Sequence, residues 1–284
     1  PPPAPPRRGA GRRGEINLGY LDGDDCLDAF VVSWCPERAC EQNNYVYIND
    51  GDEGEGSLTA TQSVGSLSSQ SAALGDIDND NDLDVLVGNY WSESSQIYLN
   101  DGNGRFTDIG FELGQVKTTD VLLADLDNDG DLDAIEAREE LGIAAWWNEG
   151  NLQFSESNLW LEGSGFHDIQ TVDSNNDGKL DIVVSSNEQN HIILQNKGMR
   201  NFDRLPLADE DGISEGEWGD LDNDGDIDAF LAMEKEKDIW LFENVRQGSN
   251  SRLNRQPQIT VSSPQKPRKG VSYAPQPLLT SPTI

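Results

Sequence analysis

One stretch of aspartates constrains this chain more than any other feature. Residues 125–133 read Asp-Leu-Asp-Asn-Asp-Gly-Asp-Leu-Asp, so five carboxylates fall on alternate positions around an Asn-Asp-Gly turn signal. At a separation of about 4 Å, each like-charged pair costs roughly 1 kcal/mol in water and about 4 kcal/mol at an effective dielectric constant of 20. Oxygen ligands at short spacing, with a glycine for the bend, favour a Ca²⁺ site. A solvated acidic turn is the alternative interpretation of a single copy.

The aspartate pattern is repeated along the chain. Complete copies begin at residues 76, 125 and 220, a variant begins at residue 173, and a degraded copy begins at Tyr20. The steps between these starts are 56, 49, 48 and 47 residues. Repetition at a nearly fixed period identifies a repeat protein.

Each repeat contains four short runs typical of β-strands. In the third repeat the runs are 119–124, 133–137, 142–147 and 152–155, with turn signals between them and no helical period. The third run of every repeat ends in an asparagine: Asn49, Asn100, Asn148, Asn196 and Asn244. A four-stranded sheet cannot bury both faces alone, whereas radial stacking buries them against each other. We therefore expect an all-β fold, a β-propeller of four-stranded blades. Five repeats are visible, and they either close as five blades or form part of a larger ring. A linear β-solenoid is the alternative, although its repeats are usually shorter.

Three of the loops that follow this asparagine carry a phenylalanine at a similar place. These residues are Phe106, Phe154 and Phe202. Packing between successive blades needs large apolar rings at a constant register, so we expect these rings to fill the core.

The charge distribution divides the chain into three parts. Residues between Glu15 and Asn244 contain all 52 acidic residues and 10 of the 20 basic ones, a net charge of −42. Such a field repels nucleic acid and anionic membranes, so neither is expected as a partner. We expect a flexible lead-in at 1–14, propeller repeats at 15–247 and a disordered basic tail at 248–284.

The compartment is inferred from calcium and from cysteine spacing. Loops of this kind often need the millimolar Ca²⁺ found outside cells, so we expect an extracellular or secreted protein. A Cys35–Cys40 disulfide would close a short connection and leave Cys26 unpaired, which is weak support for an oxidising compartment. No apolar window is long enough for a membrane span, and no signal peptide is visible, although the sequence begins without Met.

The second repeat carries a family resemblance. Its loop and exit strand read Gly-Asp-Ile-Asp-Asn-Asp-Asn-Asp-Leu-Asp-Val-Leu-Val (75–87), followed by Asn-Asp-Gly-Asn-Gly-Arg-Phe (100–106). This sequence resembles the FG-GAP/VCBS-type repeats of integrin α heads, fungal lectins and secreted bacterial proteins. The resemblance covers roughly residues 16–247 and implies a calcium-binding β-propeller. The Phe-Gly and Gly-Ala-Pro motifs of the integrin version are absent, which places the chain nearer the VCBS-like branch.

The resemblance also implies a ligand set for each loop. Positions 1, 3, 5 and 9 would supply side-chain oxygens, and position 7 would supply a backbone carbonyl. The implied ligands are Asp76, Asp78, Asp80, Asp82 and Asp84; Asp125, Asp127, Asp129, Asp131 and Asp133; Asp173, Asn175, Asp177, Lys179 and Asp181; and Asp220, Asp222, Asp224, Asp226 and Asp228. Lys179 fits because only its carbonyl is needed, so its side chain is expected to point to solvent. Four sites are therefore expected, with a weak or empty fifth at Asp22, Asp24 and Asp28, where Tyr20 replaces the first carboxylate.

The third loop also matches the EF-hand pattern, with Glu136 at its twelfth position. The other loops carry Val87, Val184 and Leu231 at that position, and strands rather than helices are expected on both sides. We therefore interpret the match as coincidence.

Catalysis has little support in the sequence. His167 and His191 lie in no recognisable triad, and no phosphate-binding loop or nucleophile elbow is present. The favoured function is a binding or adhesion module for a protein or glycan ligand; the alternative is a polysaccharide-active lyase- or hydrolase-like propeller or its accessory domain. Tyr90, Trp91, Trp160 and Trp218 are candidates for stacking on sugars, and packing between blades is the competing role.

Overall fold

The computed structural model describes residues 14–34, 43–51, 57–91, 93–157, 161–186, 192–206, 213–219, 228–233, 238–247 and 250–255. These residues form twenty strands and no helix. The Cys35–Cys40 disulfide, Trp160, His191, the fifth loop up to Asp226 and most of the expected lead-in and tail lie outside the described residues.

Each sheet contains four strands that follow one another in the chain. The first has β1 (Ile16–Gly19), β2 (Asp28–Val31), β3 (Asn44–Asn49) and β4 (Leu58–Val64). The second has β5 (Ser69–Gly75), β6 (Asp84–Asn89), β7 (Glu93–Asn100) and β8 (Phe106–Val116). The third has β9 (Thr118–Ala124), β10 (Asp133–Arg138), β11 (Gly142–Asn148) and β12 (Phe154–Glu156). The fourth has β13 (Phe166–Val172), β14 (Asp181–Ser186), β15 (Ile192–Asn196) and β16 (Phe202–Pro206). The fifth has β17 (Ile213–Gly219), β18 (Asp228–Met233), β19 (Asp238–Gln247) and β20 (Asn250–Arg255).

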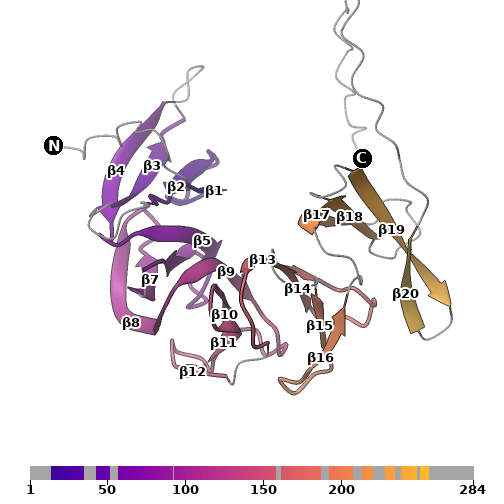
Figure 1. Cartoon of the computed structure of the whole chain (residues 1–284). Coiled ribbons are helices and arrows are strands. Elements are labelled where there is room, and N and C mark those ends of the chain that lie inside the picture. The colour runs from indigo at the N-terminus through magenta and orange to yellow at the C-terminus, as the bar shows by residue number, and fades with distance from the viewer. Residues whose placement is uncertain are drawn as a thin grey trace, which may run out of the picture.

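The five sheets have the same antiparallel topology, with each strand paired to the next in sequence. They follow one another along an arc (Figure 1). The first strands of the first four sheets contact their neighbours, and β17 of the fifth sheet contacts β14 of the fourth. Among the described residues the arc does not close into a ring. This arrangement confirms the expected β-propeller blades. The fifth sheet extends past the expected boundary at residue 247, since β20 pairs with β19. The sequence of β20 is polar and lacks the apolar pattern that would predict a strand.

The second strand of a blade shows why the blades need each other. All residues of β6, β10 and β14 are buried, since neighbouring sheets cover both faces of each strand. A strand buried on both faces is rich in apolar residues rather than alternating. An isolated blade would expose one of these faces to water, so folding of one blade depends on its neighbours.

Apolar side chains fill the spaces between successive sheets. Between the first and second sheets, Phe30 meets Phe106 edge to face with ring centroids 5.6 Å apart. Between the second and third sheets, Phe111 meets Trp146 in the same way at 6.0 Å. Another cluster lies between the third and fourth sheets. Edge-to-face pairs add stabilisation beyond the area that they bury.

The phenylalanines expected to fill the core do so. Phe106 is buried between the first two sheets, while Phe154 and Phe202 are partly buried against the next two clusters. Trp218 likewise packs against the cluster of Val172, Val183 and Ile193. The packing role weighed for Trp218 is therefore confirmed.

Carboxylates on the first strands join neighbouring blades. Oε2 of Glu15, just before β1, accepts the backbone N–H of Ala72 at 3.1 Å. The Ser71 hydroxyl on β5 donates to Asp120 Oδ1 at 2.7 Å, and Asp120 Oδ2 accepts the Ile169 N–H at 2.9 Å. Burial raises the pKa of Asp120 to about 7 despite these hydrogen bonds. The first four blades are thus connected by hydrogen bonds along their inner strands.

Candidate metal centres in the interstrand loops

Each aspartate loop connects the first and second strands of its blade. The described loops are 20–27 between β1 and β2, 76–83 between β5 and β6, 125–132 between β9 and β10, and 173–180 between β13 and β14. Because the topology is the same in every sheet, these loops lie at the same end of their blades. Of the fifth set, only Asp228 is described, and it is buried at the start of β18.

Carboxylates gather within three of these loops. Oxygen atoms of Asp76, Asp78 and Asp84 all lie within 4.8 Å of one another. The corresponding carboxylates of Asp125, Asp127 and Asp133 form a second group, and those of Asp22, Asp24 and Asp28 form a third. The structure thus brings together predicted positions 1, 3 and 9 in the second and third blades, and positions 3, 5 and 9 in the first blade, where Tyr20 occupies position 1. The position-5 residues Asp80 and Asp129 are outside these groups of described carboxylates.

The carboxylate at the ninth position of each described loop is held by two backbone hydrogen bonds. In the second blade, Asp84 Oδ2 accepts the Ile77 N–H and Oδ1 accepts the Asn100 N–H, both at 2.9 Å. The same pair of backbone contacts recurs at Asp28, Asp133 and Asp181. All four carboxylates are fully buried.

Burial makes the negative charge of these carboxylates unfavourable. It raises the pKa of Asp84 to about 6 and that of Asp133 to about 7, against the opposing effect of their backbone hydrogen bonds. Neighbouring aspartates of the same loop raise both pKa values further. A bound divalent cation would stabilise the charged form of these carboxylates and would therefore lower their pKa values.

The first and fourth positions shape the loop. Asp76 accepts the backbone N–H groups of Asp80 at 3.0 Å and Asn81 at 2.9 Å, and Asp125 and Asp173 make the equivalent contacts. The fourth residue has a positive φ, 63° at Asn79 and 62° at Asn128. Asparagine tolerates this left-handed conformation better than most residues. The Asp-x-Asp-Asn sequence therefore builds the turn from its own side chains.

The third-blade loop carries a direct sign that a cation fits. Asp127 Oδ1 is buried and has no hydrogen-bond partner. Its other oxygen accepts the Arg200 Nε–H at 2.8 Å. A buried oxygen without a partner is costly, and coordination of a hard cation would satisfy it. The donor set is carboxylate oxygen throughout, which suits calcium.

The fourth-blade loop differs from the others. Lys179 was expected to extend into solvent, but its ammonium group contacts Asp177 Oδ2 at 2.9 Å. Asp177 lies two residues before Lys179 in the same loop, so its carboxylate is within reach of the ammonium group. Asn175 Oδ1 accepts the Asp177 N–H at 2.9 Å, so the predicted position-3 oxygen is also engaged in the turn. The ammonium group of Lys179 thus places a positive charge beside the carboxylate of Asp177 within this loop.

Glu136 is not a loop ligand in this structure. It lies on β10, is fully buried and pairs with Arg138 at 2.8 Å. It also accepts hydrogen bonds from the Ser95 hydroxyl at 2.6 Å and from the Trp146 indole at 3.0 Å. Strands flank the loop, so the EF-hand match is coincidental, as expected.

The repeated asparagine has a role that the sequence reasoning missed. Its side-chain amide donates to a carbonyl of its own loop and to a carbonyl in the loop of the preceding blade. Asn196 Nδ2, for example, contacts Leu180 O at 3.1 Å and Leu126 O at 2.7 Å. Asn100 and Asn148 reach Leu21 O and Ile77 O in the same way. The strict recurrence of asparagine, rather than of any polar residue, was the available signal, because a short side-chain amide combines two N–H donors with an acceptor oxygen.

Two of the aromatic candidates for sugar stacking contact each other. Tyr90 and Trp91 meet edge to face with centroids 5.1 Å apart, and the Tyr90 hydroxyl donates to Glu139 Oε2 at 2.7 Å. The Tyr90 ring is therefore anchored between the second and third blades.

Comparison with known families agrees with this architecture. The family described as FG-GAP-like repeat matches residues 20–87, 76–136 and 173–231. A comparison with curated proteins found no match. Helices long and apolar enough to cross a membrane are absent from the described part of the chain. Since the matched segments cover more than half of the sequence, the chain belongs to the FG-GAP-like repeat family.

Proposed function

We propose that this FG-GAP-like repeat protein is an extracellular, calcium-stabilised propeller module that binds a protein or glycan ligand. The observation that carries the calcium proposal is the buried, unpartnered Oδ1 of Asp127 within a group of three carboxylates. The occurrence of a group of three carboxylates in the equivalent loops of three blades supports a metal role over a chance acidic turn.

The ligands proposed for each cation are those implied by the family resemblance. Positions 1, 3 and 9 are supported by their proximity in the second and third blades. The contributions of position 5 and of the position-7 carbonyl are part of the proposal, as are the fifth-blade residues from Asp220 to Asp228. Bound calcium would neutralise the loop carboxylates and contribute its binding free energy to folding.

The extracellular location follows from the chemistry of such a site. Loops of this kind often need millimolar calcium, which is available outside cells. The net charge of −42 between residues 15 and 244, from 52 acidic and 10 basic residues, further favours cationic over anionic surroundings. A binding role is favoured over catalysis because the described charged and polar side chains have structural roles. They form turns, join neighbouring blades or belong to the carboxylate groups of the loops.

Calcium binding is tested by isothermal titration of the metal-free protein. We expect a stoichiometry near four. Asp127→Asn should lower it by one, because the buried oxygen loses its charge. Asp203→Asn is the matched control, since Asp203 is exposed on β16 and lies outside the loops. A stoichiometry of zero would reject the proposal, and an unchanged value in Asp127→Asn would reject the third-blade site.

A further inference from the structure

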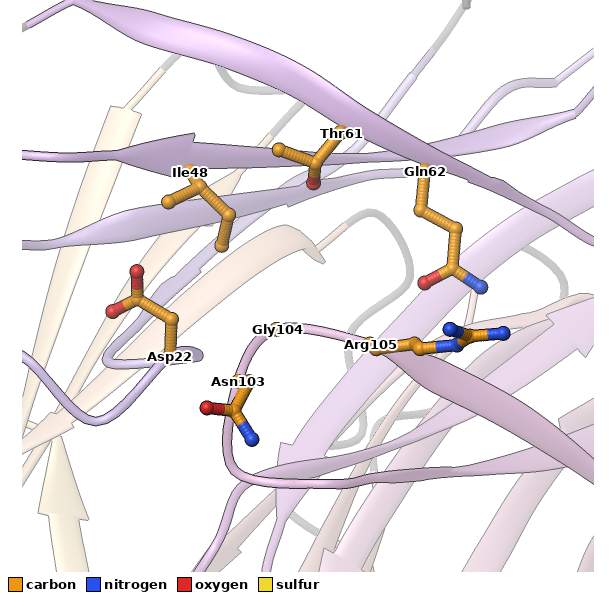
Figure 2. A pocket seen from close by; sticks show the side chains of 7 residues that line it. All are labelled: Asp22, Ile48, Thr61, Gln62, Asn103, Gly104 and Arg105. Carbon is orange, nitrogen blue, oxygen red and sulfur yellow. The ribbon is translucent and has the colours of Figure 1, made fainter. Parts of the chain in front are cut away.

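A cleft opens between the first and second blades (Figure 2). Its volume is about 420 Å³, within the range of roughly 300–1,000 Å³ typical of small-molecule sites. It lies between the first aspartate loop, strands β3 and β4, and the β7–β8 connection. Its lining residues are Asp22, Ile48, Thr61, Gln62, Asn103, Gly104 and Arg105.

Arg105 is unusual among the basic residues of this acidic protein. Of the seven Lys and Arg side chains described between residues 14 and 219, five form ion pairs with carboxylates. Arg105 and Arg204 are the two that pair with no described carboxylate. Arg105 is exposed and lines the end of the cleft opposite Asp22, with its guanidinium extending away from Asp22 (Figure 2). Its guanidinium therefore offers a free, planar set of donors suited to a carboxylate.

The wall that carries Arg105 is held in place by its neighbours. Gln62 Nε2 donates to Phe106 O at 2.6 Å, and Gln62 Oε1 accepts the Phe106 N–H at 2.9 Å. This double contact joins the first blade to the residue next to Arg105. Gly104 has φ of 70°, and a Cβ there would lie 2.6 Å from Ile48 Cδ1. The glycine thus allows the turn to approach Ile48 closely.

The remaining polar groups of the cleft can meet hydroxyls. Asn103 Nδ2 donates to Asp101 O at 2.9 Å, which leaves its Oδ1 as an acceptor. Thr61 Oγ1 donates to Val46 O at 3.4 Å, and its lone pairs remain available to a ligand hydroxyl. Asp22 lies across the cleft from Arg105 (Figure 2). The cleft therefore has a negative end and a positive end.

We infer that this cleft binds a carboxylated sugar unit, with the carboxylate on Arg105 and ring hydroxyls toward Asp22 and Asn103. The inference rests on the proposed binding function and names its ligand class. The opposite orientation would place two carboxylates together at Asp22, which like-charge repulsion disfavours. Ile48 supplies an apolar contact for the C–H face of the sugar ring. A neutral sugar would make the hydroxyl contacts but would leave Arg105 unpaired.

The test compares two ligands that differ at one carbon. Methyl glucuronide and methyl glucoside are titrated into calcium-saturated protein, and binding is followed by amide chemical shifts. We expect the glucuronide to bind about tenfold more tightly, as a charge-assisted hydrogen bond to arginine implies. Arg105→Gln should remove this preference. Arg204→Gln is the matched control, because Arg204 is the other described unpaired arginine and lies on β16, outside the cleft.

Equal affinity for the two sugars, retained preference in Arg105→Gln, or no glucuronide binding at millimolar concentration would overturn the inference. Calcium stoichiometry measured on the same samples separates this failure from that of the proposed function. Full stoichiometry without sugar preference rejects the cleft alone. A protein that binds no calcium rejects the calcium-stabilised module itself.

Discussion

At the scale of single residues, the repeats depend on side chains that satisfy backbone groups. The aspartate at the ninth position of each of the four described loops accepts two backbone N–H groups while buried. The recurring asparagine donates to carbonyls in its own loop and in the preceding one. Buried backbone groups need such partners, because leaving one unpaired costs about 1–3 kcal/mol.

Asn196→Ala should destabilise the protein by about 1–3 kcal/mol, because it leaves carbonyl groups of two loops without donors. Asn196→Asp should cost a similar amount, since a carboxylate has no N–H to donate. Urea unfolding at saturating calcium measures both changes. Gln153→Ala, at an exposed position, is the control and should have little effect. Stability equal to that of the control would show that the asparagine does not join the blades.

Arg138→Ala should destabilise the protein by about 3–5 kcal/mol, because it leaves the fully buried Glu136 without its cation. The other blades carry an apolar residue at the position of Glu136, valine in the first, second and fourth and leucine in the fifth. Glu136→Val combined with Arg138→Ala should therefore recover most of the loss. Chemical unfolding of the single and double variants provides the comparison. A double variant as unstable as Arg138→Ala would contradict the account of this pair.

At the scale of elements, most strands could be predicted from the sequence, whereas several of the side-chain contacts between and within the loops could not. The period of apolar runs predicts the four-stranded blades, and constant loop spacing predicts which aspartates converge. The strand β20 was missed because Asn250–Arg255 has a polar sequence and is held by backbone pairing. The contact of Lys179 with Asp177 was also missed, since both solvent and carboxylate satisfy an ammonium group.

The hydrogen-bond network that joins the first strands of neighbouring blades, here called the inner-strand network, was not predicted from the sequence for a different reason. Glu15, Ser71, Asp120 and Asp168 occupy the same place in successive repeats but differ in chemistry. A pattern search for one residue type does not detect a position that alternates among acids and a hydroxyl. Their proximity depends on the stacking of first strands, and it appears in the mutual electrostatic influence of Glu15, Asp120 and Asp168.

The inner-strand network predicts a pH dependence of stability. Asp120 has a folded-state pKa of about 7, above its ordinary value of 3.8, mainly because of burial. The folded state therefore retains this proton more strongly, and the contribution of Asp120 to stability falls as pH rises from about 4 to about 7. Nearby Asp168 and Glu15 act in the same direction by repulsion.

Asp120→Asn should flatten this part of the stability profile. Unfolding free energies of both proteins, measured at saturating calcium between pH 4 and pH 8, give the difference due to Asp120. The exposed Asp108→Asn on β8 is the control and should leave the slope unchanged. A profile for Asp120→Asn parallel to that of the unmodified protein would contradict the raised pKa.

At the scale of the whole molecule, neighbouring sheets share apolar cores, and the described loops of the first four sheets contact one another. Apolar clusters span neighbouring sheets, and asparagine amides cross from one loop to the preceding one. A cation that orders one loop therefore also supports the adjacent blade. Calcium-linked stability should consequently be a property of the whole stack rather than of isolated loops.

The most direct test of this account is thermal unfolding at millimolar calcium and in excess chelator. Several calcium sites linked to folding should raise the unfolding midpoint by at least about 10 °C. Magnesium at the same concentration is the control for ionic strength, and it should give a smaller rise because its strict octahedral geometry suits these loops poorly. Equal midpoints with calcium and with chelator would contradict the assignment of the aspartate loops as metal sites.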